Sequence, residues 1–450
     1  MRKCILGLLL PLVVAGSLTH AQPTGTVFSH PTWSGQSNIY EVNLRQYSSS
    51  GKISEFQKHL PRLRAMGVDI LWFMPVTPIG IEGRKMTTAD LGSYYAVRNY
   101  KAVNEEFGTM AEWKALVKKA HAMGFKVITD WVANHSARDN HWVKKHPAFY
   151  VKDSTGQLLS PYDWTDVLKL DFTNRELRDS MIDAMKFWIR ETGIDGFRCD
   201  VAGDVPTDFW KECITELRKL KHVFMLAEGE KPELHQAGFD ATYTWSLMGP
   251  LADVYSGKMN IAQLDSIINL NISRFPAHAY RMFFTTNHDE NSWNGTEFEK
   301  YGDAFKTFAV FSQTMYQSIP LIYNGQEVPN KKRLKFFVKD PIEWNKYELS
   351  SFYKTLLNLR KTNAALAADA SFERLKTSKD EAVYAYTREK DGKKVLVVMN
   401  LSPKPSAFAI PDNRINGRPL NIFLNQKEAV SSSHQFSLEP WGYIVYDYTK

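Results

Sequence analysis

Short apolar segments alternate with helical patterns through most of this 450-residue chain, and that alternation is its strongest constraint on the fold. The expected strands are rich in β-branched and aromatic residues, and the segments between them, such as 53–66, repeat apolar residues at helical spacing. Strands that alternate with helices form parallel sheets, and eight repeats favour a closed barrel over an open sheet. We therefore expect an α/β fold, a (β/α)8 TIM barrel. Its strands are expected near residues 38–43, 68–75, 125–131, 194–201, 223–227, 239–243, 281–286 and 319–323.

The alternation stops after the last expected helix, which marks a second domain. Beyond that point strand-like runs follow one another without an intervening helix, which predicts an antiparallel β domain. We assign the barrel to residues 22–366 and a C-terminal β-sandwich to residues 367–450. A short insertion is expected at about 136–170, where aromatic-rich sequence interrupts the pattern after the third strand. The C-terminal runs lie at 382–386, 394–399 and 442–446.

Residues 1–21 have the composition of a secretory signal peptide. Arg2 and Lys3 precede an apolar run at 4–16, and Ala21 supplies the small residue before a cleavage site. The run is too short to span a bilayer, and no later segment has the length and apolar character of a membrane span. We therefore expect no transmembrane segment, and export to the periplasm or the outside of the cell after cleavage.

Charge and cysteine content narrow the function classes further. The formal net charge is +7 at pH 7, but the cationic residues are scattered and form no basic stripe with interleaved aromatics. We therefore expect no nucleic-acid partner. Without the leader only Cys199 and Cys213 remain, too few for a disulfide scaffold.

An arginine and an aspartate share one face of the fourth expected strand. Arg198 and Asp200 are two residues apart in an apolar run, so their side chains point the same way. A guanidinium beside a carboxylate lowers the carboxyl pKa and keeps the group ionised, as a carboxylate nucleophile requires. A buried structural ion pair explains this motif alone equally well. The other polar clusters decide between the two interpretations.

Polar residues follow four of the expected strands at the point where each strand ends. In a (β/α)8 barrel these ends meet at one mouth, where chemistry takes place. Three carboxylates, one arginine and two histidines would gather there. No metal-binding Cys/His spacing, phosphate loop or Gly-x-Ser-x-Gly elbow accompanies them. Clustered acids then indicate acid/base and nucleophilic work by carboxylates, and glycoside hydrolysis is the leading case. The clusters are Asp130–His135, Arg198–Asp200, Glu228 and Asn287–Asp289.

The chain resembles the α-amylase family of glycoside hydrolases from about residue 38 to its C-terminus. Four short motifs occur in the family's order, and a segment at 322–327 is similar to the family's eighth-strand sequence. The motifs are Asp130-x-x-x-Asn134-His135, Gly196-Phe197-Arg198-x-Asp200, Ala227-Glu228 and Asn287-His288-Asp289.

The resemblance implies roles for the three acids. Asp200 matches the nucleophile that forms a covalent glycosyl intermediate, and Glu228 matches the general acid/base. Asp289 matches the third carboxylate, which grips sugar hydroxyls and favours the distorted transition state. The expected outcome is retention of configuration, with Asp200 and Glu228 roughly 5–5.5 Å apart.

The resemblance also implies residues that contact the sugar or orient the acids. Arg198 matches the residue that orients Asp200. His135 and His288 match histidines that hydrogen-bond the sugar, and Tyr95 matches a stacking tyrosine. We leave three tryptophans unassigned because packing explains them equally well; they are Trp131, Trp245 and Trp293.

The chain departs from the α-amylases proper just after the nucleophile. Where they carry a Lys-His pair that contacts the sugar beyond the cut, this chain has Gly203 and Asp204. That histidine also contributes to a calcium site, of which Asn134 and Asp171 are the two matching oxygen ligands. We therefore leave the metal site unassigned, treat structural calcium as an open question, and expect no cofactor to be required for the chemistry.

The leading hypothesis is a secreted, retaining hydrolase of α-1,4-glucosidic bonds in starch or maltooligosaccharides, with an α-glucan as its partner. Alternatives on the same chemistry are a cyclomaltodextrinase- or neopullulanase-like hydrolase, an α-glucosidase or an α-glucan transglycosylase. From another class, a catalytically inactive glucan-binding protein could use the same barrel, although all three acids are present.

Overall fold

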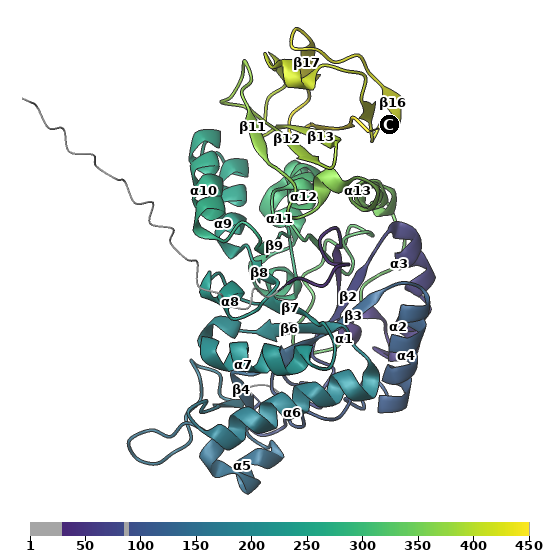
Figure 1. Cartoon of the computed structure of the whole chain (residues 1–450). Coiled ribbons are helices and arrows are strands. Elements are labelled where there is room, and N and C mark those ends of the chain that lie inside the picture. Colours follow the sequence, from purple (N-terminus) through teal and green to yellow (C-terminus); the bar gives the residue numbers. More distant parts are fainter. Residues whose placement is uncertain (1–28, 85–89, 450) are drawn as a thin grey trace, which may run out of the picture.

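The structure is a computed structural model that describes residues 29–84 and 90–449. The leader predicted at 1–21 lies outside the described residues. The described chain forms a helix-wrapped barrel with a β domain at one end, drawn at the top of Figure 1. None of its described helices has the length and apolar character needed to reach across a bilayer.

Eight parallel strands form the barrel, as the alternation predicts, in the order β10-β1-β2-β3-β6-β7-β8-β9. Backbone hydrogen bonds between β9 and the segment before β10 join the two ends of this order. The Arg281 N–H donates to the Gln317 carbonyl at 2.8 Å, and the Ile319 N–H donates to the Arg281 carbonyl at 2.9 Å. The strands are β1 (Ile39–Val42), β2 (Ile70–Phe73), β3 (Lys126–Val132), β6 (Gly196–Asp200), β7 (Phe224–Ala227), β8 (Ala241–Tyr243), β9 (Tyr280–Met282) and β10 (Leu321–Tyr323).

Inside the barrel, side chains change from apolar to polar toward the C-terminal end of the strands. In β1 the inner apolar cluster includes Ile39, and Glu41 follows two residues later; in β3 Ile128 is followed by Asp130. The apolar layer fills the end of the barrel at which the strands begin, so the buried polar groups lie at the end where the strands finish. Gly196 lies where β6 comes close to its neighbour, because a Cβ there would be 1.9 Å from a backbone carbonyl oxygen of β7.

Helices surround the barrel, and their apolar faces build the larger hydrophobic core. A capping box starts α4, in which Thr109 and Glu112 each accept a backbone N–H of the other. The single helix expected over 53–66 is two helices, since Pro61 has no N–H to donate and fits only a first turn. The helices around the barrel are α1 (Leu44–Tyr47), α2 (Ile53–Gln57), α3 (Leu60–Met66), α4 (Met110–Ala122), α6 (Arg175–Thr192), α7 (Thr207–Arg218), α8 (Glu233–Gln236), α9 (Trp245–Tyr255), α10 (Ile261–Arg274), α11 (Glu297–Tyr301), α12 (Phe305–Thr314) and α13 (Ser350–Thr362).

The insertion between β3 and β6 carries its own small sheet. Strand β4 (His135–Ala137) pairs with β5 (Val167–Lys169) in antiparallel register, and α5 (His141–Lys145) lies between them in sequence. Because β4 begins at His135, the predicted sugar-binding histidine is also the residue at which the insertion leaves the barrel. The loop before β5 returns to the barrel mouth, where Trp164 lines the cavity described below.

The C-terminal domain is antiparallel β, as predicted. Its six-stranded sheet has the order β11-β12-β13-β18-β15-β16, and β14 pairs separately with β17. Arg388 of β12 is fully buried and donates to five backbone carbonyls at the junction with the barrel. Those carbonyls belong to Thr314, Met315, Ala367, Ala370 and Ser371. The strands are β11 (Glu373–Leu375), β12 (Val383–Lys390), β13 (Lys393–Asn400), β14 (Ser406–Ala409), β15 (Leu420–Asn421), β16 (Gln426–Lys427), β17 (Gln435–Leu438) and β18 (Tyr443–Asp447).

Candidate active site

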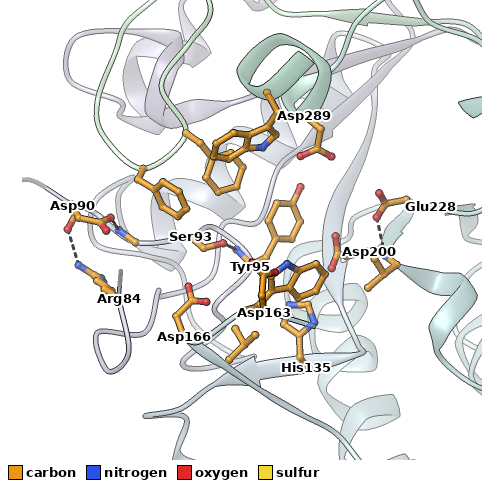
Figure 2. A pocket seen from close by; sticks show the side chains of 17 residues that line it. Arg84, Asp90, Ser93, Tyr95, His135, Asp163, Asp166, Asp200, Glu228 and Asp289 are labelled. Carbon is orange, nitrogen blue, oxygen red and sulfur yellow. Dashed lines mark hydrogen bonds between the residues drawn. The ribbon is translucent and has the colours of Figure 1, made fainter. Parts of the chain in front are cut away.

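A cavity of about 390 Å³ opens at the C-terminal ends of the barrel strands (Figure 2). Asp200 and Glu228 lie at one end of it, Arg84 and Asp90 at the other, and Tyr95 lies between them. Five of the seven predicted site residues line this cavity, and the other two, Arg198 and His288, are buried in contact with its acids. The five are Tyr95, His135, Asp200, Glu228 and Asp289.

Arg198 contacts three carboxylates from three different strands or strand ends. Its Nη1 lies 3.0 Å from Asp200 Oδ1 and 2.9 Å from Asp130 Oδ1. Its Nη2 lies 2.9 Å from Glu228 Oε2, and its Nε donates to the Tyr243 hydroxyl at 3.0 Å. A fully buried guanidinium requires such partners, and its planar shape fixes all three carboxylates relative to one another.

The pKa of Asp200 differs from the sequence-based expectation. Burial, and next the Glu228 carboxylate, raise the pKa of Asp200 well above its ordinary value, although Arg198 acts in the opposite direction. The lowering by Arg198 that the sequence predicts is present but outweighed, because the sequence shows neither the depth of burial nor the nearby second acid. Burial also raises the pKa of Asp130 to about 6 despite Arg198. Carboxylates grouped around one guanidinium in this way do not ionise independently, because each negative charge disfavours the next.

The turn after Asp200 has a strained backbone. Val201 adopts the left-handed conformation, with φ 35° and ψ 44°, which is unfavourable for a β-branched side chain. The Val201 N–H donates to Glu228 Oε2 at 2.8 Å, drawn as a dashed line in Figure 2. The strained turn thus directs a backbone donor at one oxygen of Glu228, which leaves its other oxygen for the cavity.

A second cluster of charged side chains, formed by Glu41, His288 and Asp289, connects Asp289 to the barrel interior. His288 Nδ1 lies 2.5 Å from Glu41 Oε1, and His288 Nε2 lies 3.2 Å from Asp289 Oδ2. Burial alone would lower the pKa of His288, but Asp289 and Glu41 raise it well above its ordinary value. Burial would likewise raise the pKa of Asp289, but His288 brings it below its ordinary value. Asp289 is therefore held ionised beside an imidazolium.

Tyr95 connects the two charged groups. Its hydroxyl lies 2.6 Å from His288 Nε2 and donates to Asp130 Oδ2 at 3.2 Å. Its ring is nearly parallel to that of Phe336, at an interplanar angle of 16°. The hydroxyl is thereby fixed at the cavity floor, and the ring forms part of an aromatic wall.

His135 is a neutral ring in the cavity wall. Burial lowers its pKa to about 3, so the imidazole offers a hydrogen-bonding nitrogen without charge. Trp164 from the insertion packs against it with ring centroids 5.2 Å apart. A neutral imidazole beside a partly buried aromatic ring that lines the cavity suits the hydroxyls and apolar faces of a sugar.

The loop that carries Asp289 is supported from behind by a buried acid. Glu297 Oε2 accepts from the Thr285 hydroxyl at 2.9 Å and from Gln326 Nε2 at 2.7 Å. Burial raises the pKa of Glu297 to about 7. Gln326 lies in the 322–327 segment that the sequence singles out, and it ties the end of β10 to the end of β9.

Several residues in the cavity or directly behind it were missed by sequence reasoning. Glu41 was detectable, because a lone acid interrupts an otherwise apolar strand. Trp164 and Phe336 carry no sequence signal beyond their aromatic character. Trp293 lines the cavity, whereas Trp131 is buried in the core outside the barrel and Trp245 packs against the inner cluster.

The two residues matched to calcium ligands both have hydrogen-bond partners within the protein. The Asn134 carboxamide contacts His135 Nδ1 at 3.3 Å, and Asp171 Oδ1 accepts from the Thr173 hydroxyl and N–H. Across residues 29–84 and 90–449 no group of three or more His, Cys, Asp or Glu is arranged to hold a metal. Calcium takes about six to eight oxygen ligands, and these two residues alone supply too few of them.

A parallel (β/α)8 barrel with clustered acids, one buried arginine and two histidines at its mouth has the architecture of a glycoside hydrolase. The sequence matches the alpha-amylase catalytic domain over residues 34–157 and 147–348, and the C-terminal domain of maltogenic amylase over residues 372–445. The chain belongs to the alpha-amylase family.

Similar proteins carry several names within this family. The chain is 27% identical over 404 residues to Alpha-amylase MalA of Haloarcula japonica, covering 85% of this chain and 58% of MalA. It is 27% identical over 369 residues to a cyclomaltodextrinase of a Bacillus species, covering 76% of this chain and 64% of that enzyme. Less than two thirds of each of these two relatives is therefore spanned.

The fold extends over nearly all of one solved relative. The crystal structure of the maltogenic alpha-amylase AmyB from Thermotoga neapolitana superposes with a TM-score of 0.83 at 29% identity. The match covers 92% of this chain and 99% of AmyB. The barrel and the C-terminal domain thus occur together in both proteins.

Proposed function

We propose that this protein is a retaining α-glucan hydrolase that cleaves α-1,4-glucosidic bonds in starch or maltooligosaccharides. The observation that carries the proposal is the single guanidinium of Arg198, which holds Asp200 through Nη1 and Glu228 through Nη2. Two carboxylates on adjacent nitrogens of one side chain are held close together, as the retaining mechanism requires.

In the first step Asp200 attacks the anomeric carbon and forms a glycosyl ester, while the bond to the leaving sugar breaks. Glu228 gives its proton to the glycosidic oxygen, so the leaving sugar departs as a neutral alcohol. Asp289, held ionised by His288, binds hydroxyls of the glycone and lies near the positive charge that develops on it.

In the second step a water molecule replaces the leaving sugar. The Glu228 carboxylate takes a proton from that water, whose oxygen attacks the anomeric carbon and releases Asp200 as a carboxylate. Two displacements at the same carbon leave the anomeric configuration unchanged. All proton transfers use side chains of this chain, and we propose that no cofactor takes part.

The choice among α-glucans is a separate part of the proposal. The names of the relatives support linear α-1,4-glucans first and cyclic maltodextrins second. The maltogenic amylase C-terminal domain supports the second candidate as much as the first.

The test is a product profile on maltoheptaose and on β-cyclodextrin, with polarimetric assignment of the anomer first released. We expect new reducing ends of α configuration from maltoheptaose, and none from Asp200→Asn or Glu228→Gln. Binding of maltoheptaose without turnover would overturn the proposal in favour of an inactive glucan-binding protein. Release of β-anomers would overturn retention.

We also propose export, on the composition of residues 1–21. Expression of the full chain and N-terminal sequencing of the periplasmic and extracellular fractions tests it. A mature chain beginning at Gln22 is expected. Recovery of the uncleaved chain in the cytoplasm alone would contradict the proposal.

A further inference from the structure

The position of the leaving sugar follows from Glu228, given the function proposed above. Because Glu228 protonates the glycosidic oxygen, the sugar attached to that oxygen must lie beside Glu228. The turn at residues 201–204 is adjacent, since the Val201 N–H donates to Glu228 Oε2 at 2.8 Å. At this turn Gly203 has no side chain with which to contact the sugar.

Lys231 borders the space that a side chain at position 203 would enter. A Cβ added to Gly203 would lie 3.5 Å from both Cε and Nζ of Lys231. The Lys231 ammonium donates to the Gly203 carbonyl at 2.5 Å, which fixes the end of an otherwise exposed side chain over the turn. Lys231, in the loop after Glu228, thus places a cation beside Gly203, in the loop after Asp200, which has no cationic side chain at that position.

The insertion also contacts this turn. The Tyr162 hydroxyl donates to Asp204 Oδ2, which joins the insertion to the turn after the nucleophile. The Tyr162 side chain is 67% exposed, and its ring lies 4.8 Å from that of Trp164, which packs on His135. These aromatic rings lead outward from the cavity to Asp204.

We infer that Lys231 is a specificity-determining residue that binds the leaving-group sugar, with Tyr162 and Asp204 at the same turn. The ammonium has three N–H groups, and one is used on Gly203. Within the described parts of the chain Lys231 has no carboxylate partner within 4.0 Å, so its other donors face solvent or substrate. Sugar hydroxyls accept such donors, whereas a leaving group without hydroxyls cannot.

The experiment compares two substrates with the same glycone. Maltotriose leaves a glucose in the Lys231 region, and α-maltosyl fluoride leaves only fluoride there. For Lys231→Met, which keeps the aliphatic stem, we expect the loss of kcat/KM to be about tenfold larger on maltotriose than on maltosyl fluoride. That ratio corresponds to one hydrogen bond from a charged donor. Lys258→Met, at an exposed lysine after α9, serves as the matched control and should change neither value.

The outcomes separate this inference from the proposed function. Equal losses on both substrates, or no loss on either, would overturn the role of Lys231 while the hydrolase proposal stands. Failure of the unmodified protein to cleave both substrates would overturn the proposed function, and this inference with it. A selective loss on maltotriose supports both.

Discussion

Nη2 of Arg198 lies 2.9 Å from Oε2 of Glu228, so the arginine expected to orient the nucleophile also contacts the general acid. This Nη2 makes no well-aligned hydrogen bond among the described residues, and the contact is chiefly electrostatic. The negative charges of Asp200 and Glu228 are therefore both offset by the guanidinium of Arg198.

In an Arg198→Lys protein, Asp200 and Glu228 should no longer be held by one shared cation. A lysine ammonium is a point charge and cannot reproduce the two-sided contact of a planar guanidinium. We expect kcat on maltoheptaose to fall by roughly 100-fold or more, about 3 kcal/mol, the scale of breaking a buried ion pair. Arg175→Lys, at an exposed position of α6, is the control. Unchanged kcat in a folded Arg198→Lys protein would refute the dependence.

Glu41→Gln should change the pH profile through His288. Glu41 is one of two carboxylates that raise the pKa of His288, so its removal lowers that pKa and the imidazolium deprotonates at lower pH. The alkaline limb of kcat/KM is expected to shift toward lower pH, because Asp289 then loses its cationic partner. Profiles of both proteins between pH 5 and 10 on maltoheptaose provide the measurement. An unshifted alkaline limb would show that His288 does not control it.

Glu297 should make stability depend on pH. Burial raises its pKa from 4.5 to about 7, so the folded state holds this proton more tightly than the unfolded state does. Its contribution is fully present below pH 4.5 and is lost as the pH rises to 7. The expected size is about 3 kcal/mol of unfolding free energy across that window.

The comparison for Glu297 uses an acid of the same helix. Urea unfolding at pH 5 and pH 7 should show a smaller difference for Glu297→Gln than for the unmodified protein. Glu299→Gln should keep the full difference, because Arg333 lowers the pKa of Glu299 to about 2, outside this window. Identical pH dependence in all three proteins would exclude Glu297 as the source.

Chelation should leave the enzyme active. Because Asn134 and Asp171 are engaged by His135 and Thr173, we expect EDTA to change neither kcat/KM nor the melting temperature. Activity on maltoheptaose and differential scanning fluorimetry, before and after dialysis, provide the readout. A loss that added Ca²⁺ reverses would mean that calcium is bound by a different set of oxygens.

The fold and the acids were accessible from the sequence because both depend on local patterns. The composition of each strand predicts it. Asp200 ends β6, Glu228 directly follows β7, and Asp289 lies in the loop after β9. The break at Pro61 was equally local, and the proline was a readable signal that the expectation of one helix ignored.

Relations between distant segments were not accessible. The raised pKa of Asp200 depends on Glu228 in another strand, and the position of Lys231 depends on the path of two loops. Trp164 reaches the cavity only because the insertion folds back over the mouth. The spacing of apolar residues within one segment does not show how distant segments meet in space.

The five carbonyls bound by Arg388 also bear on how the chain is made. During synthesis the segment that pairs with β1 and β9 leaves the ribosome well before β12 does. Two of the carbonyls, on Thr314 and Met315, immediately precede that segment and have no bond to Arg388 until β12 has emerged. Strand β12 therefore secures a junction that the earlier part of the chain leaves open, and in a chain that stops after α13 the carbonyls of Thr314 and Met315 would lack this donor.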